Sequence, residues 1–260
     1  NCEIYDIGMG GISLSGGDRE KLEVCKNYAE NNHIYRYARL NRTYRGAISM
    51  FGVGCVAKGN KIHDGAHLAI AFEGNEHLIT HNEIYDVCPF ADDSGAIYTL
   101  RDWTFRGNEI SYNYIHDIKR GLDNHGTFGV YLDDCVSGIL VKKNVFSNVQ
   151  TGIMVHGGRD IEILDNVIID SENAFEIRRH HKDLIENNFI GLHKKLEKIH
   201  YKSEIWKKKY PKLYTIMENM PKDPIGIMVK DNVIINTERG LYEKEAAENG
   251  EYTNNLWIKR

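Results

Sequence analysis

Residues 144–168 read NVFSNVQTGIMVHGGRDIEILDNVI, and they decide the fold because one pattern, Asn-x-(Ile/Phe), opens the stretch and returns 22 residues later. The same pattern recurs along the chain in successive steps of 28, 22, 31, 31, 22, 22 and 44 residues. A repeat of this length is typical of a solenoid, so 22 residues form one bare coil and the longer steps carry insertions. The anchors of the pattern are Asn32, Asn60, Asn82, Asn113, Asn144, Asn166, Asn188 and Asn232.

A second line of short apolar segments runs between these anchors. It comprises residues 12–14, 48–50, 70–72, 97–99, 130–132, 153–155 and 175–177. Alternation of inward and outward residues over so few positions indicates short β-strands. Two such strands per coil, each stacked on its equivalent about 4.8 Å away, predict an all-β, right-handed parallel β-helix. We expect one domain over residues 1–260, cut from a longer chain, because the first residues already resemble part of a repeat.

The repeated asparagine has two physical explanations, and we expect both to apply. Asn tolerates the left-handed backbone of a tight turn better than most residues. Stacked amide side chains can also form a hydrogen-bonded ladder that runs from coil to coil.

Residues 192–220 break the β pattern. Their apolar residues fall three and four positions apart, at 192, 196, 199, 206, 210, 213, 217 and 220, which indicates a helical insertion. Pro211 should end one helix or open another. Eight lysines make the segment basic, and we expect them to form the solvated face of a helix packed on the coils. A site for an anionic ligand is the alternative.

The composition limits the partners. A formal net charge of −4 gives no broad basic field, so we expect no nucleic-acid partner. The chain contains no run of about 18 apolar residues, so we expect no membrane insertion. The five cysteines lack the spacing of zinc ligands, and we expect most of them to be reduced core residues. The sequence does not indicate an oligomeric state.

Polar, aromatic and titratable residues gather on the outer face of the second strand line. Its outward positions in the middle coils include Glu73, Tyr98, Tyr131, Asp133, His156 and Arg178. Just beyond the strands follow Arg101, Asp102, Trp103, Asp134, Arg159 and His180. Such a mixture is not needed on a merely solvated sheet. We therefore predict a substrate-binding face made of these residues together with Asp92 and Asp93.

Hydrolysis of a glycosidic bond needs one carboxylic acid to protonate the leaving oxygen and one carboxylate to act as nucleophile or base. Asp102, Asp133 and Asp134 are the catalytic candidates, with Glu73 as the substitute if Asp102 only shapes a turn. Neighbouring coils put Asp102 and Asp133 about 5 to 9 Å apart, a range that includes both the retaining and the inverting spacing. This chemistry needs no metal and no organic cofactor.

Each candidate also has a purely structural interpretation. The three catalytic candidates could form turns or a salt bridge, because Asp readily bonds its local backbone. His156 could be an ordinary surface histidine. The rings of Tyr98, Tyr131 and Trp103 could be ordinary exposed aromatics, and Asp92 and Asp93 could cap a turn.

Several stretches carry a family resemblance. Residues 92–104 (DDSGAIYTLRDWT) are similar to D-D-x-G-A-I-Y-T-G-R-D-W-T, residues 131–138 (YLDDCVSG) to Y-L-D-D-x-x-S-G, and residues 157–160 (GGRD) to part of G-G-G-R-D. In the insertion, Trp206, Pro211 and Leu213 resemble a W…K-x-Y-P-x-L segment. These motifs are those of the right-handed β-helix proteins around glycoside hydrolase family 141, and the resemblance covers most of the chain.

The resemblance implies hydrolysis of plant polysaccharides, with α-L-fucosidase and xylanase as the activities known in that family. It also implies two acidic catalytic residues on the face of the β-helix, which correspond to Asp102 and to Asp133 or Asp134. Two departures, Leu100 and His156 in place of glycines, lie in the expected cleft, so we expect the choice of substrate to differ.

Two other functions stay open. A polysaccharide lyase would use a base such as His156 or Tyr131, and a cation such as Arg159 or Arg178 would neutralise the carboxylate of a uronic acid. A non-catalytic β-helix would bind carbohydrate without cleaving it. In all three cases we expect a polysaccharide or oligosaccharide ligand. We also expect a secreted or periplasmic location, with the cytoplasm as the alternative.

Overall fold

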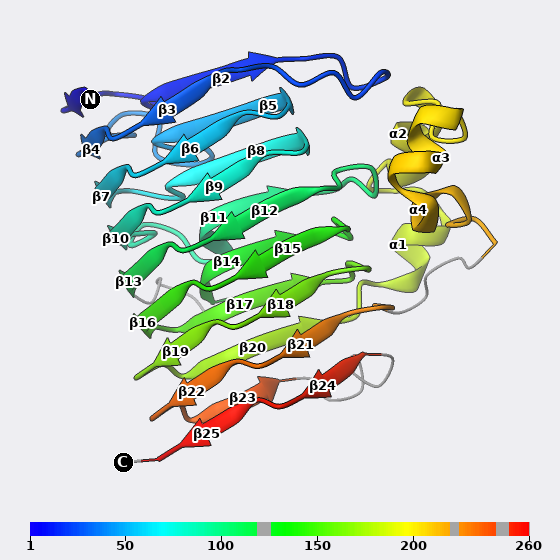
Figure 1. The fold of residues 1–260 in the computed structure, drawn as a ribbon. Helices are drawn as coiled ribbons and strands as arrows, with labels where there is room; N and C mark the ends of the chain where they lie inside the picture. Colours follow the sequence, from blue (N-terminus) through cyan, green and yellow to red (C-terminus); the bar gives the residue numbers. More distant parts are fainter. Residues whose placement is uncertain (119–125, 219–223, 243–249, 260) are drawn as a thin grey trace.

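The chain winds into stacked coils whose strands form three parallel sheets, as Figure 1 shows. The computed structural model describes residues 1–118, 126–218, 224–242 and 250–259. Each strand pairs in parallel with the equivalent strand of a neighbouring coil. The all-β parallel β-helix predicted from the repeat is therefore confirmed.

Each full coil passes through the three sheets in the order A, B, C. Sheet A consists of β1 (Glu3–Tyr5), β4 (His33–Tyr35), β7 (Lys61–Gly65), β10 (Glu83–Val87), β13 (Tyr114–Ile118), β16 (Val145–Val149), β19 (Val167–Ile169), β22 (Val233–Ile235) and β25 (Leu256–Ile258). Sheet B consists of β2 (Ile12–Gly16), β5 (Ile48–Val53), β8 (Ile70–Asn75), β11 (Ser94–Leu100), β14 (Thr127–Asp133), β17 (Thr151–His156), β20 (Asn173–Arg178) and β23 (Arg239–Tyr242). Sheet C consists of β3 (Tyr28–Glu30), β6 (Val56–Lys58), β9 (Leu78–Thr80), β12 (Asn108–Ser111), β15 (Ile139–Lys142), β18 (Glu162–Leu164), β21 (Met228–Lys230) and β24 (Glu251–Thr253).

The predicted second strand line is sheet B, and its register is confirmed residue by residue. The paired inward positions are Ile12, Ile48, Ile70, Ile97, Val130, Ile153 and Phe175. The expectation of two strands per coil was wrong, because sheet C supplies a third. Strands of sheet C are only three or four residues long, and one such as β18 buries a single central side chain, Ile163.

The core is a column of aliphatic side chains inside the coils. Ile48, Ile70, Ile97, Val130 and Ile153 are all fully buried. Each such side chain contributes about 2 kcal/mol of hydrophobic free energy relative to exposure. Because side chains alternate across a strand, the residues between these positions must face outward, and this alternation sets up the site on the outer face of sheet B.

The asparagine ladder is real and runs through the described coils. Both the backbone N–H and the Nδ2 of Asn113 donate to Asn144 Oδ1 at 2.9 Å, and the same bonds lead from Asn144 to Asn166 Oδ1 at 3.0 Å. The left-handed residue of each turn is the one before the anchor, such as Lys143 with φ 55°. The amide ladder is therefore confirmed as the reason for the repeat, whereas the explanation from left-handed backbone was wrong.

One predicted anchor does not belong to the ladder. Asn188 lies in the insertion, where its Oδ1 accepts a hydrogen bond from the backbone N–H of His193. Asn232 instead follows Asn166 directly in the ladder and donates in turn to Asn255. The step from 166 to 232 is therefore one coil with a long insertion.

The insertion consists of four short helices beside the coils (Figure 1). They are α1 (Lys182–Glu186), α2 (Leu192–Lys198), α3 (Glu204–Lys209) and α4 (Pro211–Tyr214), so the helical part begins about ten residues before the predicted 192. Pro211 opens α4, as expected. Met217 is 42% exposed, which departs from the predicted apolar face, and position 220 lies outside the described residues.

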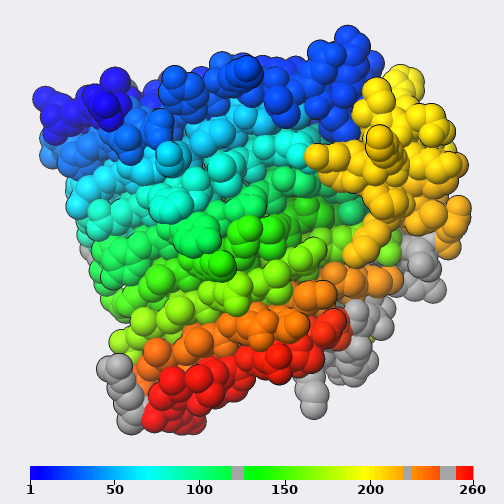
Figure 2. Space-filling view, viewed as in Figure 1, coloured from blue at the N-terminus to red at the C-terminus, as the bar shows by residue number. Residues whose placement is uncertain are grey.

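A second apolar cluster fixes the insertion to the coils. Leu192, Leu196, Trp206 and Leu213 are buried, and this cluster includes Trp103 of the β-helix. The Trp206 indole Nε1 donates to the backbone carbonyls of Arg19 and Glu20, each at 3.1 Å. Figure 2 shows the resulting contact between the yellow helical segment and the blue N-terminal coil. The expectation of helices packed on the coils is confirmed.

All five cysteines are free. Cys55, Cys88 and Cys135 are buried, Cys25 is half-buried, and Cys2 is exposed. None of the helices in the described part of the chain is long and apolar enough to cross a membrane.

Candidate functional site

The site lies where neighbouring strands of sheet B end. Leu100 of β11 pairs with Asp133 of β14, and His156 of β17 pairs with Arg178 of β20. Because Leu132 pairs with Val155, the Asp133 and His156 positions also follow one another on adjacent coils. The sequence-predicted line of outward residues is therefore present, and loops that leave these strand ends complete it.

Asp133 is the centre of the arrangement. It is buried, and its Oδ2 accepts a hydrogen bond of 2.9 Å from the hydroxyl of Tyr98. Its Oδ1 accepts from the backbone N–H of Asp134 at 2.7 Å and lies 3.0 Å from His156 Nδ1. Burial raises the pKa of Tyr98, and the charge of Asp133 raises it further, so this phenol stays a proton donor. Groups from three adjacent coils thus orient one carboxylate.

Asp134 faces a different set of groups. Its Oδ1 lies 2.8 Å from His180 Nε2, and its Oδ2 accepts from the guanidinium Nε of Arg101. Burial alone would raise the pKa of Asp134, but the hydrogen bonds from His180 and Arg101 bring it down to about 2. Burial likewise opposes the charged form of His180, yet the hydrogen bond with Asp134 raises its pKa. Asp134 is therefore a carboxylate at neutral pH and is unsuited to donate a proton.

A second acid lies beside a phenol that neighbours Tyr98. The hydroxyl of Tyr131 donates to Asp93 Oδ1 at 2.9 Å, and its ring centroid lies 5.3 Å from that of Tyr98. Burial raises the pKa of Tyr131, and the charges of Asp133 and Asp93 add to the effect. Asp93 is exposed, whereas Asp133 is buried. One solvent-facing and one buried carboxyl group are thus held by two neighbouring tyrosines, Asp93 by Tyr131 and Asp133 by Tyr98.

Tyr44 is a site residue that the sequence did not reveal. It is 59% exposed, and its ring centroid lies 6.4 Å from that of Tyr98. Burial raises its pKa, and the charges of Asp93, Asp133 and other site residues also act on it, which places its phenol close to them. It comes from residues 36–47, which make the step from Asn32 to Asn60 six residues longer than the bare coil. That excess length was the available signal.

The helical insertion borders the site. Lys195 of α2 donates from Nζ to the backbone carbonyl of Arg101 at 2.5 Å. His180 itself stands just before α1 and is buried. The insertion therefore helps to position Arg101 and His180 against Asp134.

Asp102 and Trp103 do not join the site. Asp102 is 3% exposed, and its Oδ1 accepts from the backbone N–H of Thr104 at 2.8 Å and from the Thr104 hydroxyl at 2.6 Å. These bonds form a local turn, which is the structural alternative considered for this residue. Trp103 is fully buried in the cluster beneath the helices. The interpretation of Trp103, Tyr98 and Tyr131 as exposed rings was wrong, because all three are buried.

Four other predicted binding residues lie around the edge or elsewhere. Glu73 is exposed and two coils from Asp133 in the same line, about 10 Å by strand spacing. Arg178 forms an ion pair with Glu176 on its own strand. Arg159 is buried, and Asp160 and Arg106 act electrostatically on it. Both carboxylate oxygens of Asp92 are buried, and no hydrogen bond from the described residues reaches them.

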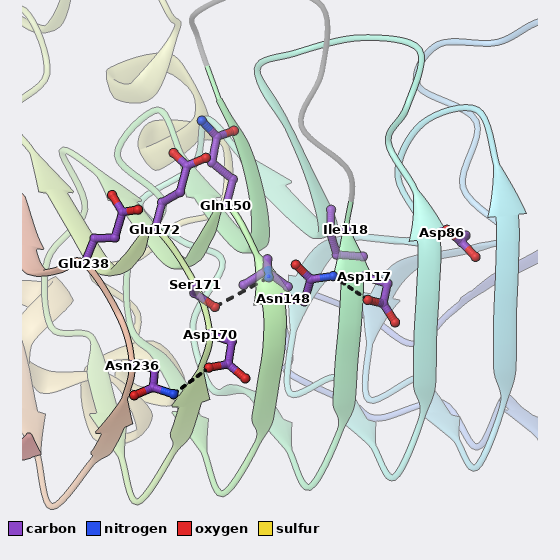
Figure 3. Close-up of a pocket in the computed structure, with 11 residues that line it drawn as sticks. Asp86, Asp117, Ile118, Asn148, Gln150, Asp170, Ser171, Glu172, Asn236 and Glu238 are labelled. Carbon is purple, nitrogen blue, oxygen red and sulfur yellow. Dashed lines mark hydrogen bonds between the residues drawn. The ribbon is translucent and has the colours of Figure 1, made fainter. Parts of the chain in front are cut away.

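A separate acidic groove of about 610 Å³ lies between sheets A and B, where the strands of sheet B begin (Figure 3). Asp86, Asp117, Asn148, Asp170 and Asn236 line it, all at positive φ between 47° and 54°. Asn148 Nδ2 donates to Asp117 Oδ1 at 2.6 Å, and Asn236 Nδ2 donates to Asp170 Oδ1 at 3.0 Å. Asp and Asn tolerate the left-handed backbone of these stacked turns, so the groove has a structural explanation. The groove lies at the opposite end of the sheet B strands from Asp133. The residues around Asp133 are the better candidate site because their side chains form a network of acids, phenols and imidazoles.

Comparison with known proteins supports the fold. A family model described as "Right handed beta helix region" matches residues 46–210. Among solved structures, the chain is similar to one titled "The complex structure of XylC with xylose", with 12% identity and a TM-score of 0.29. That similarity covers 89% of this chain and 52% of the other, so this chain spans about half the length of its relative. No curated protein matches. Because the family model covers more than half of the sequence, the chain belongs to the right-handed β-helix family.

Proposed function

We propose that the outer face of sheet B binds a carbohydrate and hydrolyses a glycosidic bond, with Asp133 and Asp93 as the two carboxyl groups. The observation that carries the proposal is the edge-to-face pair of Tyr98 and Tyr131, with ring centroids 5.3 Å apart. Their hydroxyls donate to Asp133 and Asp93 respectively, which brings both acids to one part of the face. Hydrolysis of this kind needs two carboxyl groups on either side of the bond to be cleaved. Their different exposure suits different roles, because environment decides which carboxyl group holds a proton.

The sequence motifs support the same reaction class. Asp93, Tyr98 and Arg101 belong to one stretch that resembles glycoside hydrolase family 141, and Tyr131 and Asp133 belong to another. These stretches are about thirty residues apart in sequence, yet their side chains contact one another. Convergence of two family-like motifs on one pair of acids favours a plant-type polysaccharide or oligosaccharide as substrate.

The separation of the two acids decides the stereochemistry of hydrolysis. Retaining enzymes place their carboxyl groups about 5 Å apart, whereas inverting enzymes leave about 6.5 Å or more for a water molecule. NMR of the first-formed sugar anomer therefore distinguishes the two mechanisms.

The activity test is reducing-end release from a panel of plant polysaccharides and fucosylated oligosaccharides, with ultraviolet absorbance read in parallel. We expect Asp133→Asn and Asp93→Asn each to lower turnover by about two to four orders of magnitude while binding is retained. Asp170→Asn, in an exposed turn, is the matched control and should keep full activity.

Other outcomes assign other functions. Growth of ultraviolet absorbance in place of reducing ends would identify elimination by a lyase. Carbohydrate binding that survives both substitutions, without any turnover in the wild type, would identify a binding module. Retained hydrolysis in both variants would refute the proposed carboxylate pair.

A further inference from the structure

Three side chains from consecutive coils converge beside Asp133. Asp134 follows β14, His156 ends β17, and His180 follows β20. Asp134 Oδ1 lies 2.8 Å from His180 Nε2 and 3.9 Å from His156 Nδ1, and the three atoms all lie within 4.8 Å of one another. Within the part of the chain that the structure describes, these residues form the one group of three or more histidine, cysteine and acidic side chains with such spacing.

His180 is buried against the carboxylate of Asp134. Its side chain is only 3% exposed, and its Nε2 lies 2.8 Å from Asp134 Oδ1. Its Nδ1 lies 3.5 Å from the backbone carbonyl of His181, at the limit of a hydrogen bond. A neutral imidazole with its proton on Nε2 donates to Asp134. With its proton on Nδ1 it turns the lone pair of Nε2 to the carboxylate oxygen, and a metal ion between the two groups stabilises that tautomer.

The distances fit a metal ion. Tetrahedral zinc with ligands at about 2.0 to 2.1 Å separates its donor atoms by about 3.3 Å. The two separations from Asp134 Oδ1, 2.8 and 3.9 Å, lie on either side of that value. The imidazole rings of His156 and His180 are stacked with their centroids 4.6 Å apart, which keeps both rings beside Asp134.

The surroundings resemble those of a metal site. Arg101 donates to the second oxygen of Asp134, and the backbone carbonyl of His181 lies 3.5 Å from Nδ1 of His180. Such outer contacts commonly orient metal ligands. Two imidazoles and a carboxylate favour zinc or a similar transition metal over calcium and magnesium, which prefer oxygen ligands alone.

We propose that Asp134, His156 and His180 bind a divalent metal ion of the zinc class, with the fourth position facing Asp133. The inference departs from the expectation of a metal-free protein and goes beyond the proposed function. Metal binding is measured without any carbohydrate. The proposal of a metal site and the proposal of hydrolysis are therefore tested independently.

The test is calorimetric titration of the chelator-treated full chain with Zn²⁺, together with elemental analysis after dialysis. We expect one tightly bound zinc ion per chain, with a Kd below about 1 µM. His180→Ala and His156→Gln should each weaken binding by about tenfold or more. Circular dichroism identifies a variant that fails to fold. If His180→Ala does not fold, His156→Gln still tests the site. Co²⁺ in place of Zn²⁺ should give the visible absorption of a histidine-ligated ion.

A surface histidine pair provides the matched control. His33 Nε2 and His63 Nε2 lie 2.7 Å apart on sheet A and can hold zinc weakly without a buried carboxylate. His63→Ala should leave the tight site unchanged. Binding that disappears in His63→Ala but persists in His180→Ala would overturn the inference. Folded wild-type protein that binds zinc no tighter than about 100 µM would also overturn it.

Discussion

Removal of one ladder amide should destabilise the protein far more than its size suggests. Asn144 is fully buried, and Asn144→Ala deletes two bonds from Asn113 and the two N–H donations of Nδ2, which are shared among Asn166 and the carbonyls of Ile110 and Lys142. At about 1 kcal/mol for each bond, the free energy of unfolding falls by about 4 kcal/mol. The left-handed residue of this turn is Lys143, so alanine at position 144 adds no backbone strain. Urea unfolding followed by circular dichroism measures the loss as a lower midpoint.

The control removes an amide of the same type from the surface. Asn148 is exposed, and its Nδ2 donates only to Asp117 Oδ1 among the hydrogen bonds described above. Because Asn148 has φ 54°, glycine is the substitution that avoids strain. Asn148→Gly should cost less than about 1 kcal/mol. Equal losses in the two variants, or a loss below about 1 kcal/mol for Asn144→Ala, would refute the view that the ladder stabilises the coils.

Three further predictions concern pH, ligand binding and oxidation. Burial lowers the pKa of His67 to about 4, whereas its pKa in the unfolded chain is about 6.5. Between these two pH values only the unfolded chain binds the proton. The contribution of neutral His67 to stability is therefore fully present above pH 6.5 and is lost as the pH falls towards 4. That contribution is about 3 kcal/mol of the free energy of unfolding. In His67→Gln the urea midpoint should therefore change less with pH over this range. Tyr44→Ala should raise KM about tenfold with little change in kcat if the exposed ring binds sugar, and a pure kcat effect would contradict this role. The Sγ atoms of Cys25 and Cys55 lie 3.3 Å apart, so oxidised glutathione should join them in a disulfide and remove two titratable thiols. The free energy of unfolding should rise by about 3 kcal/mol, and retention of all five thiols would contradict the prediction.

Much of the scaffold follows from the sequence because its rules are local and repeated. The inward positions of sheet B, such as Ile97 and Val130, were predicted with their partners, since side-chain alternation and the coil length together fix the register. Sheet C was missed because a strand such as β9 has too few residues to show a period. Asn188 was misassigned because Asn-Phe-Ile in the insertion copies the ladder pattern by chance.

The site was less predictable because it depends on loops. Asp133 and His156 were found because they lie on strands of known register. The direction in which Asp102 turns is decided by its bonds to Thr104, which the pattern of the coils does not specify. Tyr44 reaches the site through a long loop without any repeat, so its position could not be derived from the spacing of strands.

The contact between Trp206 and the carbonyls of Arg19 and Glu20 changes how the molecule can come apart. In a linear array of coils, unfolding can start at either end and pass from one neighbour to the next. The helical insertion follows β20 in the sequence, yet it packs beside the loop that follows β2. The helical insertion therefore connects the two ends of a row of seven strands in sheet B. The first coil can unfold only after the helices detach from it. The stability of the first coil is thereby coupled to that of the coil that contains β20. Unfolding that starts at the first coil should then involve the helical insertion as well, in one cooperative step.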